Sequence, residues 1–138
     1  MKTPTIGDCR LCGESRVLVR SHILPEFLWK PTYDEKGRAR KYQEGDARFT
    51  FMQKGHREPL LCHPCDHETL GDLERRFSQY WYHGDSRPAR LVGNGTTLRD
   101  LDYGTFKLFH LSVLWRASIA SHPYYAQVRL GPHEGELR

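Results

Sequence analysis

Four cysteines carry the clearest chemistry in this sequence. They form two Cys-x-x-Cys pairs, with Cys9 and Cys12 in the first pair and Cys62 and Cys65 in the second. Zn²⁺ prefers four soft ligands in a tetrahedron, and each pair supplies two thiolates on a tight backbone turn. The sequence therefore predicts a four-cysteine zinc site. Because four thiolates leave no open position for water, we expect this zinc to be structural. The alternative is four unrelated free thiols.

The composition indicates where the chain works and what it binds. The sequence begins MKTPTIGDCR, without the apolar core of a signal peptide, and has no run of about 18 apolar residues that could span a membrane. We therefore expect a cytoplasmic protein, in which thiols stay reduced. The 138 residues, 38% of them hydrophobic, suit one compact domain or a small domain with an appendage. A net charge of +4 is compatible with a polyanionic partner such as nucleic acid.

A second set of polar residues lies outside the cysteine pairs. Ser21 and His22 follow the stretch 16-RVLVR-20, whose alternation predicts a strand. Pro25 disfavours helical geometry in the residue before it, so Ser21 and His22 lie at a strand end or in a loop. Asp66 follows the last cysteine directly. His22 also has an ordinary interpretation as a packed histidine, and Asp66 as an acid that stabilises a helix N-terminus.

Two helices must position these residues. Apolar residues at helical spacing predict a helix from Asp66 to about residue 82. We expect its other acids to be solvated or paired; they are Glu68, Asp72 and Glu74. The stretch 103–120 predicts a second helix with Asp102 as its N-cap. Two apolar stripes are typical of a helix buried on two sides.

These elements divide the chain into three parts. We expect a zinc-stabilised domain over 1–83, a turn-rich linker over 84–101, and an apolar helix with a tail over 102–138. The last part would pack on the domain or meet a partner. The 103–120 helix could therefore mediate homo-oligomer formation or contact a partner domain.

A polar, basic region separates the first strand from the second cysteine pair. The stretch 30–47 contains a proline and two glycines and predicts an irregular loop. The segments 48–52 and 57–62 predict a β-hairpin around Lys54–Gly55. The densest basic cluster either contacts nucleic-acid phosphates or belongs to a solvated loop; it consists of Arg38, Arg40, Lys41 and Arg48.

Taken in order, these features resemble the HNH endonucleases in their zinc-stapled ββα-metal, or treble-clef, form. The order is a Cys-x-x-Cys pair, a strand ending in x-His-x-x-Pro, a hairpin, and Leu-Cys-x-x-Cys-Asp opening a helix, all within residues 9–80. The resemblance implies an α+β fold, with a small treble-clef domain that holds a four-cysteine zinc site and is followed by a helical C-terminal segment. It also implies hydrolysis of DNA phosphodiester bonds with one divalent metal ion.

The resemblance assigns roles to individual residues. His22 stands where the family has its general base, and imidazole can take a proton from water at cellular pH. Asp66 stands where the family has a ligand of the catalytic metal, and its carboxylate suits Mg²⁺ or Mn²⁺. Ser21 stands where the family has a second, aspartate ligand, so we expect it to be an auxiliary ligand.

The sequence departs from the family at two positions. The first is Ser21, and the missing ligand could be replaced by its hydroxyl, by water, or by a helix side chain: His67, Glu68 or Glu74. The second is the family's middle asparagine, because His56 or Arg57 occupies that region. These departures favour an alternative, a treble-clef module that binds nucleic acid or protein without cleaving it. A third possibility is an assembly subunit that works through its apolar C-terminal helix.

Overall fold

The computed structural model describes residues 3–81, 89–92, 95–98 and 102–138, and the chain has the predicted α+β fold. Its central sheet is antiparallel, in the order β1-β2-β5. The strands are β1 (Thr5–Asp8), β2 (Ser15–His22) and β5 (Arg57–Cys62). Two separate two-stranded hairpins complete the strands: β3 (Ala39–Tyr42) with β4 (Phe49–Met52), and β6 (Ala89–Val92) with β7 (Gly95–Leu98).

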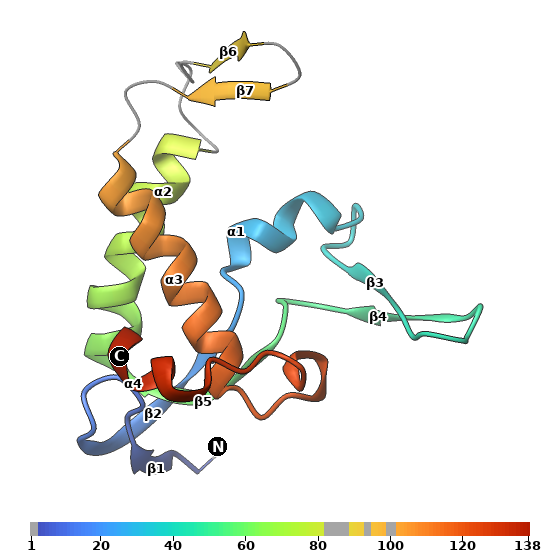
Figure 1. Ribbon diagram of the computed structural model, residues 1–138. Helices are drawn as coiled ribbons and strands as arrows, with labels where there is room; N and C mark the ends of the chain where they lie inside the picture. Colours follow the sequence, from blue (N-terminus) through green and yellow to red (C-terminus); the bar gives the residue numbers. More distant parts are fainter. Residues whose placement is uncertain (1–2, 82–88, 93–94, 99–101) are drawn as a thin grey trace.

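The two long helices, α2 (Gly71–Trp81) and α3 (Tyr103–Ile119), lie side by side (Figure 1). The short α1 (Glu26–Trp29) follows β2, and a 3-10 turn (Lys30–Thr32) extends it. After β5, a π-helical segment (Pro64–Leu70) runs directly into α2 (Gly71–Trp81). The longest helix is α3 (Tyr103–Ile119). The tail contains two 3-10 turns (Pro123–Tyr125 and Gly131–His133) and ends in α4 (Glu134–Leu137).

The predicted N-cap of α3 is confirmed. The backbone N–H of Thr105 donates to Asp102 Oδ1 at 3.1 Å, which satisfies one of the free amides of the first turn. Hydrogen bonds with Thr105 also hold the pKa of the Asp102 carboxyl below its ordinary value.

Aromatic packing joins α2 to α3. Phe77 of α2 and Phe109 of α3 stack with their ring centroids 3.7 Å apart, and Phe27 of α1 packs against both rings. Leu73, Phe77 and Phe109 are buried together. Because burying an aromatic side chain removes a large apolar area from water, this cluster fixes the two helices against each other.

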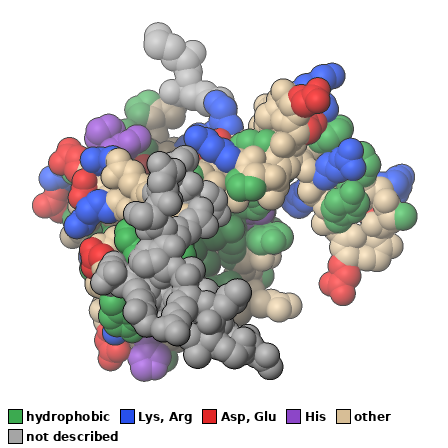
Figure 2. All heavy atoms as spheres, turned by 90° about the horizontal axis from the view of Figure 1, so that it is seen from above, with side chains coloured by type: hydrophobic (Ala, Val, Ile, Leu, Met, Phe, Trp, Pro, Cys, Tyr) green, Lys and Arg blue, Asp and Glu red, His purple; other side chains and the backbone are tan. Residues whose placement is uncertain are grey.

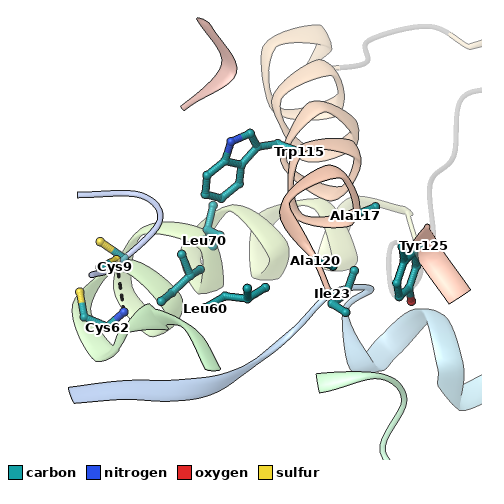
Figure 3. Close-up of a cluster of buried hydrophobic side chains, with 11 residues drawn as sticks. Cys9, Ile23, Leu60, Cys62, Leu70, Trp115, Ala117, Ala120 and Tyr125 are labelled. Atoms are coloured by element: carbon teal, nitrogen blue, oxygen red, sulfur yellow. Dashed lines mark hydrogen bonds between the residues drawn. The ribbon is translucent and has the colours of Figure 1, made fainter. Parts of the chain in front are cut away.

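A second core joins α3 to the central sheet (Figure 3). Trp115 and Ala117 of α3 pack in one buried cluster with Ile23, Leu60 and Leu61 from β2, β5 and their ends. The C-terminal segment therefore packs on the part of the chain that holds the four cysteines and shares its core. The tail then returns to the first cysteine pair, where Arg138 Nε donates to the Leu11 carbonyl at 3.0 Å.

The predicted strand pairing was wrong. Segments 48–52 and 57–62 are both strands, but β4 pairs with β3, and β5 pairs with β2. Leu60 and Leu61 are buried, so β5 gains more apolar burial in the central sheet than it would in a hairpin with β4. Consequently, part of the 30–47 stretch predicted as irregular is the strand β3. Within the predicted 84–101 linker, the structure describes the β6–β7 hairpin; the remainder of that linker lies outside the described residues.

Within the part of the chain that the structure describes, every helix is too short or too polar to span a membrane.

Candidate zinc centre and histidine site

The four cysteines converge on one point. Their sulfur atoms all lie within 4.8 Å of one another, although Cys9 and Cys65 are more than fifty residues apart. The Sγ atoms of Cys12 and Cys62 are 3.9 Å apart. A tetrahedral zinc with Zn–S bonds of about 2.3 Å requires sulfur atoms roughly 3.8 Å apart, so the donor set fits Zn²⁺.

Local backbone structure brings each cysteine pair to this point. The first pair lies in the turn between β1 and β2, where Gly13, at φ +79°, lets its N–H reach the Cys9 carbonyl at 2.8 Å. The second pair spans the end of β5 and the start of the π-helical segment. A main-chain bond from Arg10 N–H to the Leu60 carbonyl, at 3.0 Å, joins the two halves.

The electrostatics of the cluster favour a bound cation. Burial acts to raise the pKa of the Cys9 thiol, but hydrogen bonds from the backbone of Cys62, Cys12 and Leu11 outweigh it and lower this pKa to about 6. The Cys62 N–H lies 3.3 Å from Cys9 Sγ. Burial and the neighbouring sulfur atoms raise the pKa of Cys65. Crowded thiolates repel one another, so a divalent cation is what allows all four to stay deprotonated together.

His22 ends β2 and is held by two acceptors. Its Nε2 lies 2.9 Å from Glu26 Oε2 and 3.1 Å from the Lys54 carbonyl oxygen. A carboxylate and a carbonyl both accept hydrogen bonds, so Nε2 carries the proton and Nδ1 has the lone pair in the neutral ring. The side chain is 26% exposed, so water can reach it. Glu26 reaches His22 because the chain bends at Ile23 and Leu24, and α1 begins directly after Pro25.

A tight turn supplies the second acceptor. Lys54 and Gly55 both have φ of 60°, a left-handed conformation, and this turn directs the Lys54 carbonyl at His22. The Trp29 indole lies against Gly55, so an added Cβ there would overlap the ring. This contact could not be predicted from an asparagine side chain, because a main-chain carbonyl makes it. The signal that could have indicated it is the Lys-Gly turn.

His56 lies in the core, in the region where the family has its asparagine. Its Nδ1 is 3.1 Å from the Tyr125 hydroxyl, and its ring stacks on His122 with centroids 4.1 Å apart. Burial, followed by the charges of His122 and Lys41, lowers the pKa of His56 to about 4. Its carbonyl accepts from the Ile23 N–H at 3.1 Å, which ties this loop to the end of β2.

The depressed pKa of His56 predicts acid sensitivity. An unfolded chain binds a proton at residue 56 near the ordinary histidine pKa of about 6.5, whereas the folded chain resists protonation down to pH 4. The free energy of unfolding should therefore be unaffected by His56 above pH 6.5 and fall from there toward pH 4, by at most about 1.4 kcal/mol per pH unit. Urea titrations of wild type and His56→Gln between pH 7 and pH 4.5 should show the shallower decline in the variant. The two proteins differ only at residue 56, so equal slopes would contradict the prediction.

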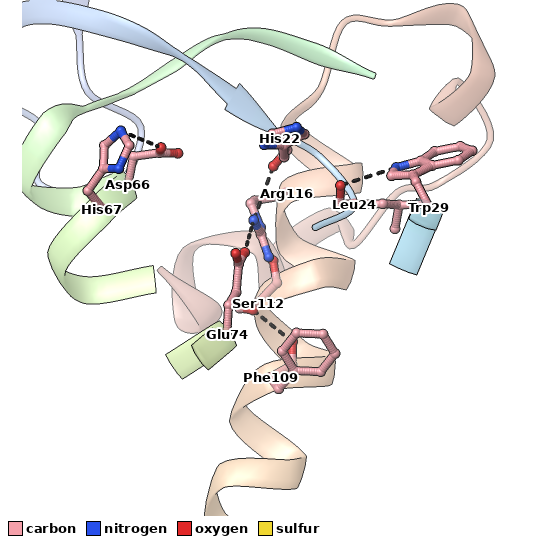
Figure 4. Close-up of polar contacts among 9 residues, drawn as sticks. All are labelled: His22, Leu24, Trp29, Asp66, His67, Glu74, Phe109, Ser112 and Arg116. Atoms are coloured by element: carbon pink, nitrogen blue, oxygen red, sulfur yellow. Dashed lines mark hydrogen bonds and ion pairs between the residues drawn. The ribbon is translucent and has the colours of Figure 1, made fainter. Parts of the chain in front are cut away.

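Arg116 connects three elements beside His22 (Figure 4). Its Nη1 donates to the His22 carbonyl at 3.1 Å and to Glu74 Oε1 at 2.6 Å, while Nε donates to the Ser112 carbonyl at 3.3 Å. The residue is 1% exposed. One guanidinium thus fixes the end of β2 to α2 and α3. Sequence analysis placed Glu74 on a solvated or paired face and gave Arg116 no role; a lone arginine in an otherwise apolar helix was the available signal.

The remaining predicted site residues lie on different elements. Asp66 is in the first turn of the π-helical segment, 18% exposed, with Oδ2 3.6 Å from His67 Nε2. Ser21 is fully buried, and its hydroxyl lies 3.5 Å from the Val19 carbonyl. Among the described residues, the four cysteines form the one cluster of three or more Cys, His, Asp or Glu ligands suited to a single ion.

The other helix acids and the basic cluster are also located. Asp72 pairs with Arg75 and Arg76, and Glu68 is exposed. The four basic residues lie on or beside the β3–β4 hairpin, which extends away from the helices (Figure 1). In Figure 2, Lys and Arg side chains alternate with hydrophobic ones on this lobe, at the right of the view.

Comparisons with protein-family models, curated proteins and solved structures gave no match to this chain. Of the features that carry the resemblance to HNH endonucleases, the four-cysteine cluster is the one that the structure supports directly.

Proposed function

We propose that this chain is a zinc-stabilised, HNH-type endonuclease domain that hydrolyses DNA phosphodiester bonds with His22 as the general base. The observation that carries the proposal is the fixed orientation of the His22 imidazole. Two acceptors, Glu26 Oε2 and the Lys54 carbonyl, hold Nε2–H. A histidine whose ring is oriented by a carboxylate on one nitrogen, and whose side chain is 26% exposed to water, has an arrangement that suits general-base catalysis.

The chemistry follows from this orientation. Nδ1 of His22 takes a proton from water, and the resulting hydroxide attacks phosphorus in line. The phosphorus–oxygen bond to the leaving strand breaks, and the leaving oxygen takes a proton from solvent. Glu26 stabilises the imidazolium that forms, because its carboxylate already accepts from Nε2–H at 2.9 Å.

Of Asp66 and Ser21, the residues predicted to hold a catalytic divalent ion, Asp66 alone offers a carboxylate. Mg²⁺ is usually held by one or two carboxylates together with waters and substrate phosphates. Asp66 is the carboxylate that would hold such an ion here, since Arg116 already occupies Glu74. The ion would stabilise charge on the phosphate and leaving oxygen. Ser21 has no ligand role in this proposal, because its hydroxyl is buried and directed at the Val19 carbonyl.

One observation favours the second candidate, a treble-clef module that binds nucleic acid without cleaving it. The same buried Ser21 leaves the strand end without the ligand that the family uses, and Glu74 is paired with a guanidinium. Such a module would keep the zinc and the basic hairpin and lack hydrolysis.

A cleavage assay with matched histidine variants distinguishes the two candidates. Zinc-loaded protein is incubated with supercoiled plasmid and with single-stranded DNA in Mg²⁺, in Mn²⁺ or without added divalent metal. His22→Ala should lose about 10²- to 10⁴-fold in rate, the usual contribution of general-base catalysis. His133→Ala removes a histidine that is 68% exposed in the tail and should leave the rate unchanged.

Cleavage that survives in His22→Ala would overturn the mechanism. A wild-type protein that shifts DNA in a gel and cleaves none under any metal would overturn the nuclease proposal and support the binding module. Zinc content and circular dichroism of each variant show that a loss of rate is not a loss of fold.

A further inference from the structure

The β3–β4 hairpin has one face that carries its aromatic side chains and a second face that carries Ala39, Lys41, Thr50 and Met52. Its register places Arg40 opposite Phe51 and Tyr42 opposite Phe49. Directly paired residues share a face, and so do residues two apart on one strand. Arg40, Tyr42, Phe49 and Phe51 therefore lie on the same face of the ribbon.

The rings on this face are exposed and touch one another. Tyr42 is 61% exposed, Phe49 41% and Phe51 48%. The centroids of Tyr42 and Phe49 are 5.8 Å apart, and those of Phe49 and Phe51 are 5.3 Å apart. They form a continuous strip of three rings in water, and exposed apolar strips of this kind usually mark an interaction surface.

Guanidinium groups line the same strip. Arg38 Cζ lies 3.9 Å from the centroid of Phe51, and Arg40 Cζ lies 5.0 Å from that of Phe49. Asp34 holds Arg38 in place through Oδ2 at 2.8 Å. Arg48 directly precedes β4, is 89% exposed, and pairs with Asp46 at 3.2 Å at the surface, where a phosphate can compete for it. Residues 38–52 contain four basic and two acidic side chains, so the hairpin is positively charged.

We propose that this aromatic face binds an unpaired nucleic-acid strand. Bases of such a strand would stack on Tyr42, Phe49 and Phe51, while its phosphates pair with Arg40 and Arg48. An unpaired strand offers both base faces and phosphates, which is the combination that this surface complements. A duplex hides its base faces, and a ribbon that reads a duplex groove needs polar side chains toward base edges where this face has rings.

This inference rests on the proposed function and specifies its substrate: DNA with a single-stranded segment. The stacking face is sequence-tolerant, because every base has a face to stack. We therefore expect cleavage near unpaired segments with little sequence preference.

Binding is tested apart from cleavage by using the His22→Ala chain without added divalent metal. Fluorescence anisotropy measures the Kd for a labelled oligothymidine and for a labelled duplex of the same length. The unpaired strand should bind at least 10-fold more tightly than the duplex. Phe49→Ala with Phe51→Ala should weaken binding of the unpaired strand by about 100-fold, since each lost stack typically reduces affinity about 10-fold.

Two control variants sharpen the result. Tyr103→Ala removes an aromatic side chain that is 65% exposed at the start of α3 and should leave the Kd unchanged. Phe51→Tyr keeps a stacking ring and should retain most of the affinity.

Arg40→Gln tests the phosphate contact separately. It should reduce the slope of log Kd against log salt concentration by the amount expected for about one phosphate contact.

Several outcomes would overturn the proposal. Equal affinity for duplex and single strand, or no loss in the double phenylalanine variant, would exclude stacking. Binding to anionic phosphatidylserine vesicles in place of DNA would assign the strip to a membrane surface. Tight single-strand binding by a protein that never cleaves DNA would support this inference, while the nuclease proposal would fail. Cleavage that is unaffected by the phenylalanine changes would support the nuclease proposal, while this inference would fail.

Discussion

Zinc removal is expected to unfold the whole described core and not only the turn between β1 and β2 that holds Cys9 and Cys12. The zinc ligands come from the β1–β2 turn and from the junction of β5 with the π-helical segment. Cys9, Cys62 and Cys65 belong to the same buried cluster as Trp115 and Ala117 of α3. Structural Zn²⁺ contributes roughly 10–16 kcal/mol of apparent binding free energy, comparable to or above the 5–15 kcal/mol by which typical domains are stable. Without the metal, we expect no cooperative folded state.

Cys65→Ser should show the same loss. The variant leaves a buried hydroxyl among three thiolates and lacks the fourth soft ligand. We expect no bound zinc by elemental analysis and no cooperative thermal transition by circular dichroism. In the wild type, a strong chelator should produce the same spectrum, and added Zn²⁺, but not Mg²⁺, should reverse it. A chelated protein that is free of zinc yet keeps its transition would contradict the structural role.

The second large effect is expected at Arg116. Arg116→Met removes the donor to Glu74, whose side chain is only 23% exposed, and to the His22 carbonyl. Breaking a buried ion pair from one side typically costs about 3–5 kcal/mol, because the remaining charge is left without a partner. Urea unfolding of the zinc-loaded protein measures this loss. The proposed cleavage activity should fall as well, because Arg116 no longer holds the main chain of His22 in place.

A double variant tests whether the cost comes from the unpaired carboxylate. Arg116→Met with Glu74→Met removes both charges and should be much less destabilised than the sum of the single changes. Arg76→Met is the matched control on α2. Its guanidinium is 60% exposed and pairs with Asp72 at the surface, so its loss should change stability by no more than about 0.5 kcal/mol. If Arg116→Met is as mild as Arg76→Met, the buried pair does not hold the strand end.

The features predicted correctly from sequence are those that depend on local patterns. The Cys-x-x-Cys spacing indicated the four-sulfur cluster, and apolar periodicity with Asp102 indicated α3. The strands β4 and β5 were located but given the wrong partners. A period of two identifies a strand, while its partner depends on which sheet buries Leu60 and Leu61, and that is a property of residues far away in the chain.

At the candidate site too, the features that depend on local sequence could be predicted and those that depend on long-range packing could not. His22 was placed at a strand end by local reasoning, and the structure places it there. Glu26 is also local, four residues away, yet its contact with His22 depends on the bend at Ile23 and Leu24. Arg116 lies 94 residues from His22 in the chain. Only the packing of α3 onto the sheet brings them together, and no spacing rule reports that distance.

At the Lys54–Gly55 turn, the atom that contacts His22 belongs to the main chain, while the residue types determine only whether the turn forms. The acceptor for His22 is a peptide oxygen, which every amino acid at position 54 would provide. The sequence must encode the left-handed conformation of both Lys54 and Gly55, and at Gly55 it must also leave room for the Trp29 indole. A sequence motif defined by side-chain types would therefore not detect this contact with His22. The His22 imidazole thus has a second acceptor that comes from the main chain and requires no asparagine side chain.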